Sequence, residues 1–244
     1  MKRSKTITAR GPLDRMARAS LRESGSSMRR LEHSCAAAVA AAGEVAITCL
    51  QNGGTLFFCG NGGSAADAQH LAAELAGRYA FDRPALAAVS LTTNTSSLTA
   101  IGNDYAYQQV FSRQLEGLGT RGDVLVAIST SGVSPNVLRA VDTAKKLGMT
   151  VIGFTGAKGS SFAAKCDLAL ITPSFSTPRI QEGHIAMGHA MCELVERALF
   201  EPVATRTGTS RAAARPRRVA TAKVTPIRRA ATASHVRGGG KRRR

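Results

Sequence analysis

The stretch "LFFCGNGGSAADAQHLAAELAGRY", residues 56–79, passes from four apolar residues through a pair of glycines into a segment with helical spacing. The apolar run predicts a buried strand, and the spacing after it predicts a helix. Glycine permits a positive φ at such a corner, while the start of the helix offers unpaired N–H groups and the positive end of its dipole. The corner is therefore typical of a phosphate-binding turn, with Asn61, Gly62, Gly63 and Ser64 at its centre.

A second corner of this kind is "ISTSGVS", residues 128–134. In an open α/β sheet both corners would lie at the carboxyl ends of strands, where ligands bind. A glycine turn alone also serves as an ordinary tight connection, but a hydroxyl cluster after a second strand favours a ligand site. Neither corner has a Walker lysine, and "GNGGSA" differs from GxGxxG, which disfavours a nucleotide. The hydroxyl donors precede a helix expected near Pro135, and they are Ser129, Thr130, Ser131 and Ser134.

The apolar runs of the chain predict its architecture. They lack the polar alternation of half-exposed strands, and helical stretches such as Asn136–Leu147 separate several of them. This pattern predicts a three-layer α/β sandwich with a central, mostly parallel five-stranded sheet, preceded by a helix over about Met28–Gln51 and closed by one over about Arg179–Phe200. The five runs are Thr55–Gly60, Leu86–Leu91, Asp123–Ser129, Thr150–Gly156 and Leu168–Pro173.

The charge is concentrated at the two ends of the chain. Of 244 residues 43% are hydrophobic, and the formal net charge is +17. Residues 1–30 hold nine Lys and Arg against two Asp and Glu, and residues 201–244 hold thirteen against one. We expect a basic flexible arm over 1–27, one globular domain over 28–202 and a basic disordered tail over 203–244. The arms could contact nucleic acid or another polyanion nonspecifically, or remain solvated without a dedicated ligand.

The cysteines and the apolar stretches bear on the compartment. Five scattered cysteines, an odd number, indicate reduced, packed thiols rather than a disulfide framework. The N-terminus lacks the apolar region of a secretory signal, and the longest apolar stretch, Cys35–Leu50, is shorter than a membrane span. We expect a soluble, cytoplasmic protein with no membrane contact.

His70 and Glu74 form the first group of side chains suited to acid–base or metal chemistry. They are four residues apart on the predicted helix, so they project from one face of it. Such a pair can also be an ordinary surface contact. Its place one or two turns after a phosphate-type corner favours a functional role.

The second group lies on the predicted helix of "TPRIQEGHIAMGHAMCELVE", residues 177–196. Gln181 and His189 are eight residues apart, so both can face one cavity. Glu182 and His184 lie on the same helix, and spacing alone does not exclude His184 as a candidate. A structural role remains open for each of these residues.

Several motifs together resemble a known family. "FFCGNGGSAADAQHLAAEL", followed in order by "AIGNDYAYQQVFSRQLEGLGTRGDVLVAISTSGVSPNVLRAVDTAKKLGMTVIGFTG", resembles the sugar isomerase (SIS) domain, which has a flavodoxin-like fold. The similarity is greatest to the bacterial phosphoheptose isomerases. It covers about Leu31–Phe200 and does not extend to the two basic arms.

The resemblance implies roles for particular residues. One zinc ion per subunit would be held by His70, Glu74, Gln181 and His189, although an amide is an unusual zinc ligand. Glu74 would also be the catalytic base and His189 the catalytic acid. The implied substrate contacts are Asn61, Gly62, Gly63, Ser64, Arg78, Asn103, Asp104, Ser129, Thr130, Ser131, Ser134 and Gln181.

The implied reaction is the isomerisation of sedoheptulose 7-phosphate to D-glycero-D-manno-heptose 7-phosphate through an enediolate. It is the first step of ADP- or GDP-heptose biosynthesis, which serves lipopolysaccharide and related glycans. The family forms homotetramers, and the alanine-rich helix near the N-terminus would pack well against another subunit.

Three other functions remain open at this point. A non-catalytic SIS protein that binds the replication initiator DnaA carries a similar glycine loop but lacks the carboxylate that matches Glu74. A sugar-phosphate regulator, or an isomerase of another sugar phosphate, would use the same hydroxyl-rich corners. A nucleic-acid-associated scaffold would use the basic arms, which lack the aromatic residues of a specific reader.

Overall fold

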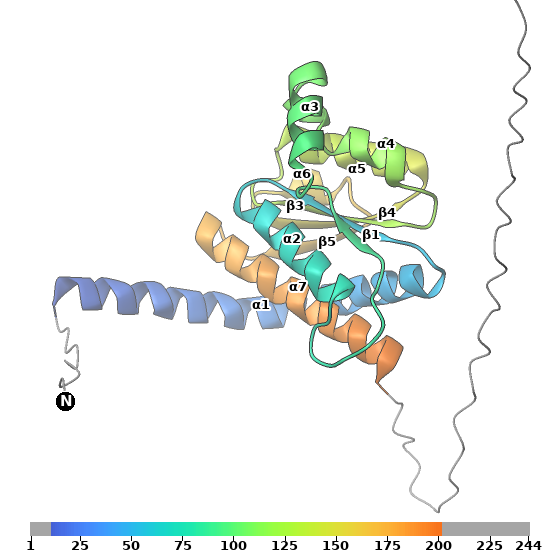
Figure 1. Cartoon of the computed structure of the whole chain (residues 1–244). Helices are drawn as coiled ribbons and strands as arrows, with labels where there is room; N and C mark the ends of the chain where they lie inside the picture. Colours follow the sequence, from blue (N-terminus) through green and yellow to red (C-terminus); the bar gives the residue numbers. More distant parts are fainter. Residues whose placement is uncertain (1–10, 202–244) are drawn as a thin grey trace, which may run out of the picture. The chain divides into compact units, whose positions relative to one another are not determined.

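The structure is a computed structural model that describes residues 11–201 (Figure 1). Most of the first basic arm that we expected lies within these residues, whereas residues 1–10 and the tail, residues 203–244, lie outside them. The helices are α1 (Pro12–Gln51), α2 (Gly63–Ala76), α3 (Thr95–Tyr105), α4 (Ser112–Leu118), α5 (Pro135–Leu147), α6 (Ser160–Ala163) and α7 (Thr177–Phe200), with a 3-10 turn, η1 (Tyr107–Gln109).

Five strands form one parallel sheet in the order β2-β1-β3-β4-β5. The register places Phe58 beside Val126, and Ile128 beside Phe154. All five predicted strands are present, and the sheet is parallel throughout. The strands are β1 (Leu56–Gly60), β2 (Ala88–Ser90), β3 (Val124–Ser129), β4 (Thr150–Gly156) and β5 (Leu168–Thr172).

Helices cover the two faces of this sheet (Figure 1), and an apolar cluster fills the space on each face. Successive side chains of a strand point to opposite faces, so Phe58 packs among residues of α1, α2 and α7 while Phe57 packs on the α4–α5 side. Both β1 phenylalanines are buried. The sheet between two helical layers confirms the predicted three-layer sandwich.

Helix α1 begins much earlier than the sequence suggested. We expected it to start near Met28, after a flexible arm, but it starts at Pro12, so the expectation was wrong for the part of the arm after residue 11. Pro12 supplies a φ that suits the first helical turn. Two contacts with α7 also order this half: Ser24 donates to Glu182 at 2.7 Å, and Arg179 donates to the carbonyl of Ser20 at 2.9 Å.

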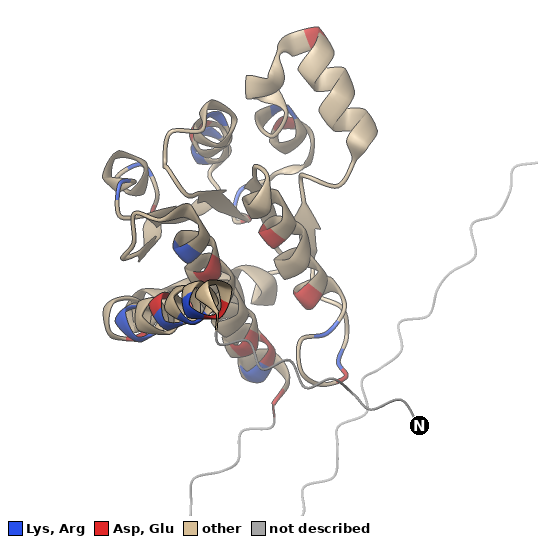
Figure 2. Ribbon diagram, turned by 90° about the vertical axis from the view of Figure 1, so that its left-hand side faces the viewer, with Lys and Arg blue, Asp and Glu red and all other residues tan. Residues whose placement is uncertain are grey.

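Helix α1 is long and apolar enough, by those two criteria alone, to cross a membrane. A core helix of a soluble protein meets the same criteria. The second half of α1 packs as such a helix, with Leu31, Cys35, Val39 and Ala42 buried against the domain. Both arginines and acidic residues occur along α1 and α7 (Figure 2), so neither helix carries charge of one sign only.

Candidate active site

Helices α2 and α7 run side by side in the same direction (Figure 1). Gly188 of α7 lies against the Leu71 side chain, where a Cβ atom would clash. Near the start of both helices, the amide group of Gln181 lies against Gly63, where a Cβ would force that amide to move. Glycines at these two positions therefore permit the close approach of the two helices that carry the predicted catalytic groups.

Three of the predicted metal ligands meet between these helices. Nε2 of His70 lies 2.7 Å from Nε2 of His189 and 3.4 Å from Oε1 of Glu74. The three potential ligand atoms all lie within 4.8 Å of one another. The side chains are 48% exposed for His70 and 21% exposed for Glu74, so the cluster is open to a ligand. Two imidazoles and a carboxylate form a donor set that suits a borderline divalent cation.

Gln181, the fourth predicted ligand, lies toward the phosphate-type corner. Its amide contacts Gly63, seven residues before His70 on α2. The structure therefore places Gln181 at the glycine turn, about two helical turns before the His70 position on α2.

The first corner has the backbone that its glycines predicted. Gly62 precedes α2 with a φ of 56°, a conformation that favours glycine. Asn61 and Asn136 exchange two side-chain hydrogen bonds of 2.8 Å, and the hydroxyl of Tyr107 donates to Asn61 Oδ1 at 3.3 Å. Sequence reasoning missed Asn136 and Tyr107, because both are distant from the motif in sequence.

The second corner is held by its own hydroxyl groups. The hydroxyl of Ser129 donates to that of Ser134 at 3.2 Å and accepts from the N–H of Gly132 at 3.1 Å. Ser131 Oγ accepts from the N–H of Val133 at 3.4 Å. Because β1 and β3 are neighbours, this corner lies beside the first at the carboxyl edge of the sheet, and the Asn61–Asn136 pair joins the two.

Other predicted contacts lie at exposed positions. Asn103 and Asp104 are on the last turn of α3, where the Asn103 amide donates to the Asp104 carboxylate at 2.8 Å. Arg78 is exposed in the segment after α2, and Thr130 is half-buried in the second corner. Among the described residues, no polar contact links Asn103, Asp104 or Arg78 to the imidazole cluster.

Asp67 and Tyr79 also belong to this region, although sequence reasoning missed both. Asp67 lies one turn before His70, and its Oδ2 atom is buried without a hydrogen-bond partner among the described residues. Burial raises the pKa of Asp67 to about 6, opposed by the nearby His70. The Tyr79 ring lies 5.9 Å from the His189 ring, centroid to centroid, and burial with nearby carboxylates raises the pKa of Tyr79. Helical spacing from His70 would have indicated Asp67.

His184 lies apart from the cluster. It is fully buried, and its ring packs 5.8 Å from that of Phe154. Burial lowers its pKa to about 4, against a weaker opposing effect of the Thr155 backbone, so the ring is neutral. Among the described residues, neither ring nitrogen has a partner of hydrogen-bonding geometry.

A parallel α/β domain with glycine- and serine-lined corners, and a histidine–carboxylate cluster on the helix that starts at one of them, is of the SIS type. The family model of the SIS domain matches residues 21–156. The phosphoheptose isomerase of Rhodospirillum rubrum is 58% identical over 165 residues, which cover 68% of this chain and 88% of that protein. The one from Bradyrhizobium sp. is 56% identical over 168 residues, which cover 68% of this chain and 85% of that protein.

Solved structures give the same family. Phosphoheptose isomerase GmhA from Neisseria gonorrhoeae matches with a TM-score of 0.72 and 47% identity, covering 75% of this chain and 98% of that one. A phosphoheptose isomerase from Francisella tularensis matches with a TM-score of 0.73 and 34% identity, covering 77% of this chain and 99% of that one. The chain belongs to the phosphoheptose isomerase family of SIS domain proteins.

Proposed function

We propose that the protein converts sedoheptulose 7-phosphate to D-glycero-D-manno-heptose 7-phosphate, the first step of ADP- or GDP-heptose biosynthesis. The observation that carries this proposal is the cluster of His70, Glu74 and His189, whose ligand atoms lie within 4.8 Å of one another beside two phosphate-type corners. Family membership agrees with it. An isomerase of an open-chain sugar phosphate needs both parts, one for the phosphate and one for the carbons that exchange hydrogen.

The two corners would hold the phosphate. Hydroxyl groups of Ser129, Ser131 and Ser134, and the N–H groups of Gly63 and Asn136 at the start of α2 and α5, are donors of the kind that bind phosphate oxygens. Asn61 is fixed by Asn136 and Tyr107, so its side chain enters this region already ordered. Ordering before binding reduces the entropy lost when the substrate binds.

Glu74 and His189 would carry the proton transfers. The carboxylate of Glu74 would take a proton from carbon 1 of the ketose and return it to carbon 2. One C–H bond therefore breaks and one forms. His189 would donate a proton to the neighbouring oxygen and recover it from the other oxygen. The contact with the ring nitrogen of His70 at 2.7 Å shows that the His189 nitrogen points into the cluster rather than to the core.

Zinc fits the groups that are present. The ring nitrogens of His70 and His189 face each other, so at least one of them accepts a hydrogen bond and carries a lone pair. A cation binds such lone pairs, and the Glu74 carboxylate adds a negative charge. We infer that His70, Glu74, His189 and Gln181 hold one zinc ion per subunit. The proton transfers would then use the second carboxylate oxygen of Glu74 and the second ring nitrogen of His189, which the ion leaves free. When bound, the ion supplies electrostatic stabilisation of the oxygen that becomes negative during enolisation.

We also infer a homotetramer in the cytoplasm. The large apolar side chains of Leu13, Met16 and Leu21 are exposed along the first half of α1, which supports a contact with another subunit. The five cysteines are free thiols, which supports a reducing compartment. The arms, including the tail of residues 203–244, would contact polyanions nonspecifically.

The proposal is tested by an isomerase assay on sedoheptulose 7-phosphate, run with the purified protein before and after treatment with a chelator. We expect the aldose product from the untreated protein, loss of most activity on chelation, and recovery when Zn²⁺ is added back. Binding of the sugar phosphate without turnover, in protein supplied with Zn²⁺, would contradict the enzyme and favour a regulator or another non-catalytic SIS protein.

A further inference from the structure

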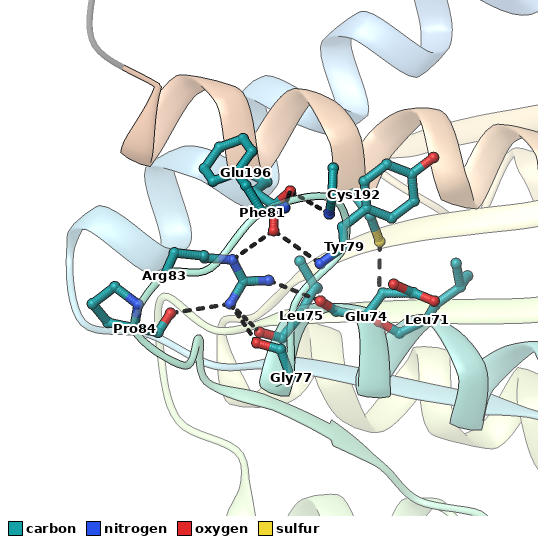
Figure 3. Close-up of polar contacts among 11 residues, drawn as sticks. Leu71, Glu74, Leu75, Gly77, Tyr79, Phe81, Arg83, Pro84, Cys192 and Glu196 are labelled. Carbon is teal, nitrogen blue, oxygen red and sulfur yellow. Dashed lines mark hydrogen bonds and ion pairs between the residues drawn. The ribbon is translucent and has the colours of Figure 1, made fainter.

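Beyond the site, helices α2 and α7 are joined by a buried ion pair between Arg83 and Glu196 (Figure 3). Nε of Arg83 lies 2.9 Å from Oε1 of Glu196, and each side chain is only 1% exposed. The two residues are 113 positions apart in the sequence. A charged pair that is removed from water so completely requires further hydrogen bonds to offset the loss of hydration.

Glu196 finds those bonds in the segment that follows α2. Its carboxylate accepts from the backbone N–H groups of Tyr79 at 2.9 Å, Ala80 at 2.7 Å and Phe81 at 3.4 Å. Burial alone raises the pKa of Glu196, but the amides of Ala80 and Tyr79 together with Arg83 more than offset it, so its pKa lies below the usual range. The carboxylate is charged at neutral pH and fixes the backbone beside Tyr79.

Arg83 finds its other bonds at the end of α2. The last carbonyl groups of a helix have no partner within the helix. The Arg83 guanidinium donates to the carbonyls of Glu74 at 2.8 Å, Leu75 at 2.7 Å and Gly77 at 3.1 Å, and also to that of Pro84 at 3.0 Å (Figure 3). One of these carbonyls belongs to Glu74, the residue that carries the catalytic carboxylate in the proposed function.

The pair therefore contacts both helices that carry the imidazole cluster. Glu196 lies seven residues after His189 on α7, and Arg83 binds the backbone of Glu74 on α2. The Tyr79 ring, next to an amide that Glu196 holds, lies 5.9 Å from the His189 ring. These contacts fix the spacing of the two helices two turns from the cluster.

We propose that Arg83 and Glu196 are positioning residues for the isomerase reaction: together they hold the end of α2 and residues 77–84 against α7, so that Glu74 and Tyr79 keep their places beside His189. The inference rests on the proposed function. A shift of about 1 Å in a reacting group can lower a rate roughly 100-fold, so a rigid support at this distance matters for turnover.

The test compares Glu196→Gln with Asp123→Asn as a matched control. Asp123 is also a buried carboxylate, 4% exposed, and it accepts from the backbone N–H groups of Thr55 and Thr120 at 2.8 Å each. It lies just before β3, at the edge of the sheet opposite the two corners. Both substitutions should lower the melting temperature, because each leaves buried donors poorly paired.

Only Glu196→Gln should change the kinetics. At a temperature where both variants are folded, we expect its kcat to fall roughly 10- to 100-fold with KM within about two-fold of wild type, while Asp123→Asn keeps both within about two-fold. Arg83→Lys is a second variant for the case in which Glu196→Gln does not fold, and it should also lower kcat because a single ammonium cannot reach the same carbonyls. Equal kcat in wild type and Glu196→Gln, with melting temperatures lowered alike in the two carboxylate variants, overturns the inference.

Crystal structures of the two variants separate this inference from the proposed function. If the wild-type protein does not isomerise the sugar phosphate, the proposed function fails, and the structures alone decide the positioning role. Displacement of residues 77–84 and of the Tyr79 ring in Glu196→Gln, but not in Asp123→Asn, supports it. An unmoved segment in Glu196→Gln overturns it.

Discussion

Two polar clusters on the same pair of helices differ in almost every physical respect. The Arg83–Glu196 cluster is 1% exposed, and its charged atoms have partners at 2.7–3.4 Å. The His70–Glu74–His189 cluster, two turns away, is up to half exposed, and its two nearest nitrogens face each other at 2.7 Å. The first cluster is complete as it stands, whereas the second presents lone pairs that a ligand can use.

The degree of burial and of hydrogen bonding distinguishes structural from functional polar groups in this molecule. A buried charge that is fully hydrogen-bonded stabilises one arrangement and resists change. A cluster in which acceptors converge and few donors satisfy them is poorly stable alone and becomes favourable when a cation or a substrate binds. Substitutions in the open cluster should therefore affect turnover with little change in stability, whereas substitutions of Arg83 or Glu196 should lower stability as well as turnover.

The largest effect is expected for Glu74→Gln, in the open His70–Glu74–His189 cluster. Removal of the base should lower kcat roughly 10²- to 10⁴-fold, since general acid–base catalysis contributes rate factors of that size. The melting temperature should hardly change, because the side chain is partly exposed. Steady-state assay and thermal denaturation measure the two quantities.

Glu116→Gln is the control for this prediction. Glu116 is an exposed carboxylate on α4, away from the imidazole cluster, so its amide variant should keep wild-type kcat. If Glu74→Gln retains a comparable kcat, Glu74 is not the base.

The next largest effect is expected for Glu196→Leu, in the buried Arg83–Glu196 cluster. It leaves the Arg83 guanidinium buried without its partner, which should lower the free energy of unfolding by roughly 3–5 kcal/mol. Urea denaturation at one fixed protein concentration measures it. The double variant Arg83→Met/Glu196→Leu should recover much of that loss, because two apolar side chains leave no unpaired charge. A double variant no more stable than Glu196→Leu would count against this account.

A smaller effect, dependent on pH, is expected at His184, which is buried, unlike His189 on the same helix. The pKa of His184 is lowered to about 4 by burial, so between about pH 6.5 and 4 the unfolded chain takes up a proton at this residue that the folded chain does not. Stability therefore falls as pH falls through this window, by up to about 1.4 kcal/mol per pH unit from this residue.

Comparison with His184→Gln isolates that contribution. The stability difference between wild type and variant, measured by urea denaturation at several pH values, should be constant above about pH 7 and shift in favour of the variant below 6.5. Parallel stability curves between pH 4 and 7 would show that His184 is not buried as a neutral ring.

The sequence was sufficient to predict the sheet, because its strands lie in continuous apolar runs. It was also sufficient to predict α5, which begins at Pro135 and ends before Gly148, a glycine in the left-handed region. It was insufficient for α3 and α4. Helix α3 has no buried residue, so it lacks the apolar stripe that reveals a helix, and α4 has only seven residues. The start of α1 was missed for a similar reason, since its first half is mostly polar and exposed.

Within the site, local spacing was enough where the partners share a helix. His70 and Glu74 could be paired from their separation alone, and the resemblance to a family selected His189 from the candidates on the last helix. Partners set by tertiary structure could not be found in this way: Asn61 and Asn136 are 75 positions apart, and Arg83 and Glu196 are 113 apart. No local pattern marks such pairs, because their contact depends on how the strands are ordered.

The smallest effect is expected for Tyr107→Phe, which weakens the support of the first corner. The lost hydrogen bond to Asn61 is long, 3.3 Å, and the Tyr107 ring is 61% exposed, so the net loss should be about 0.5 kcal/mol, roughly a two-fold rise in KM with kcat unchanged. Asn136→Ala should raise KM more, because it removes both 2.8 Å bonds to Asn61 from a buried position. The order of the two KM values is the useful result. A larger rise for Tyr107→Phe than for Asn136→Ala would mean that the tyrosine hydroxyl contacts the substrate directly, and that the corner is held by fewer groups than the structure indicates.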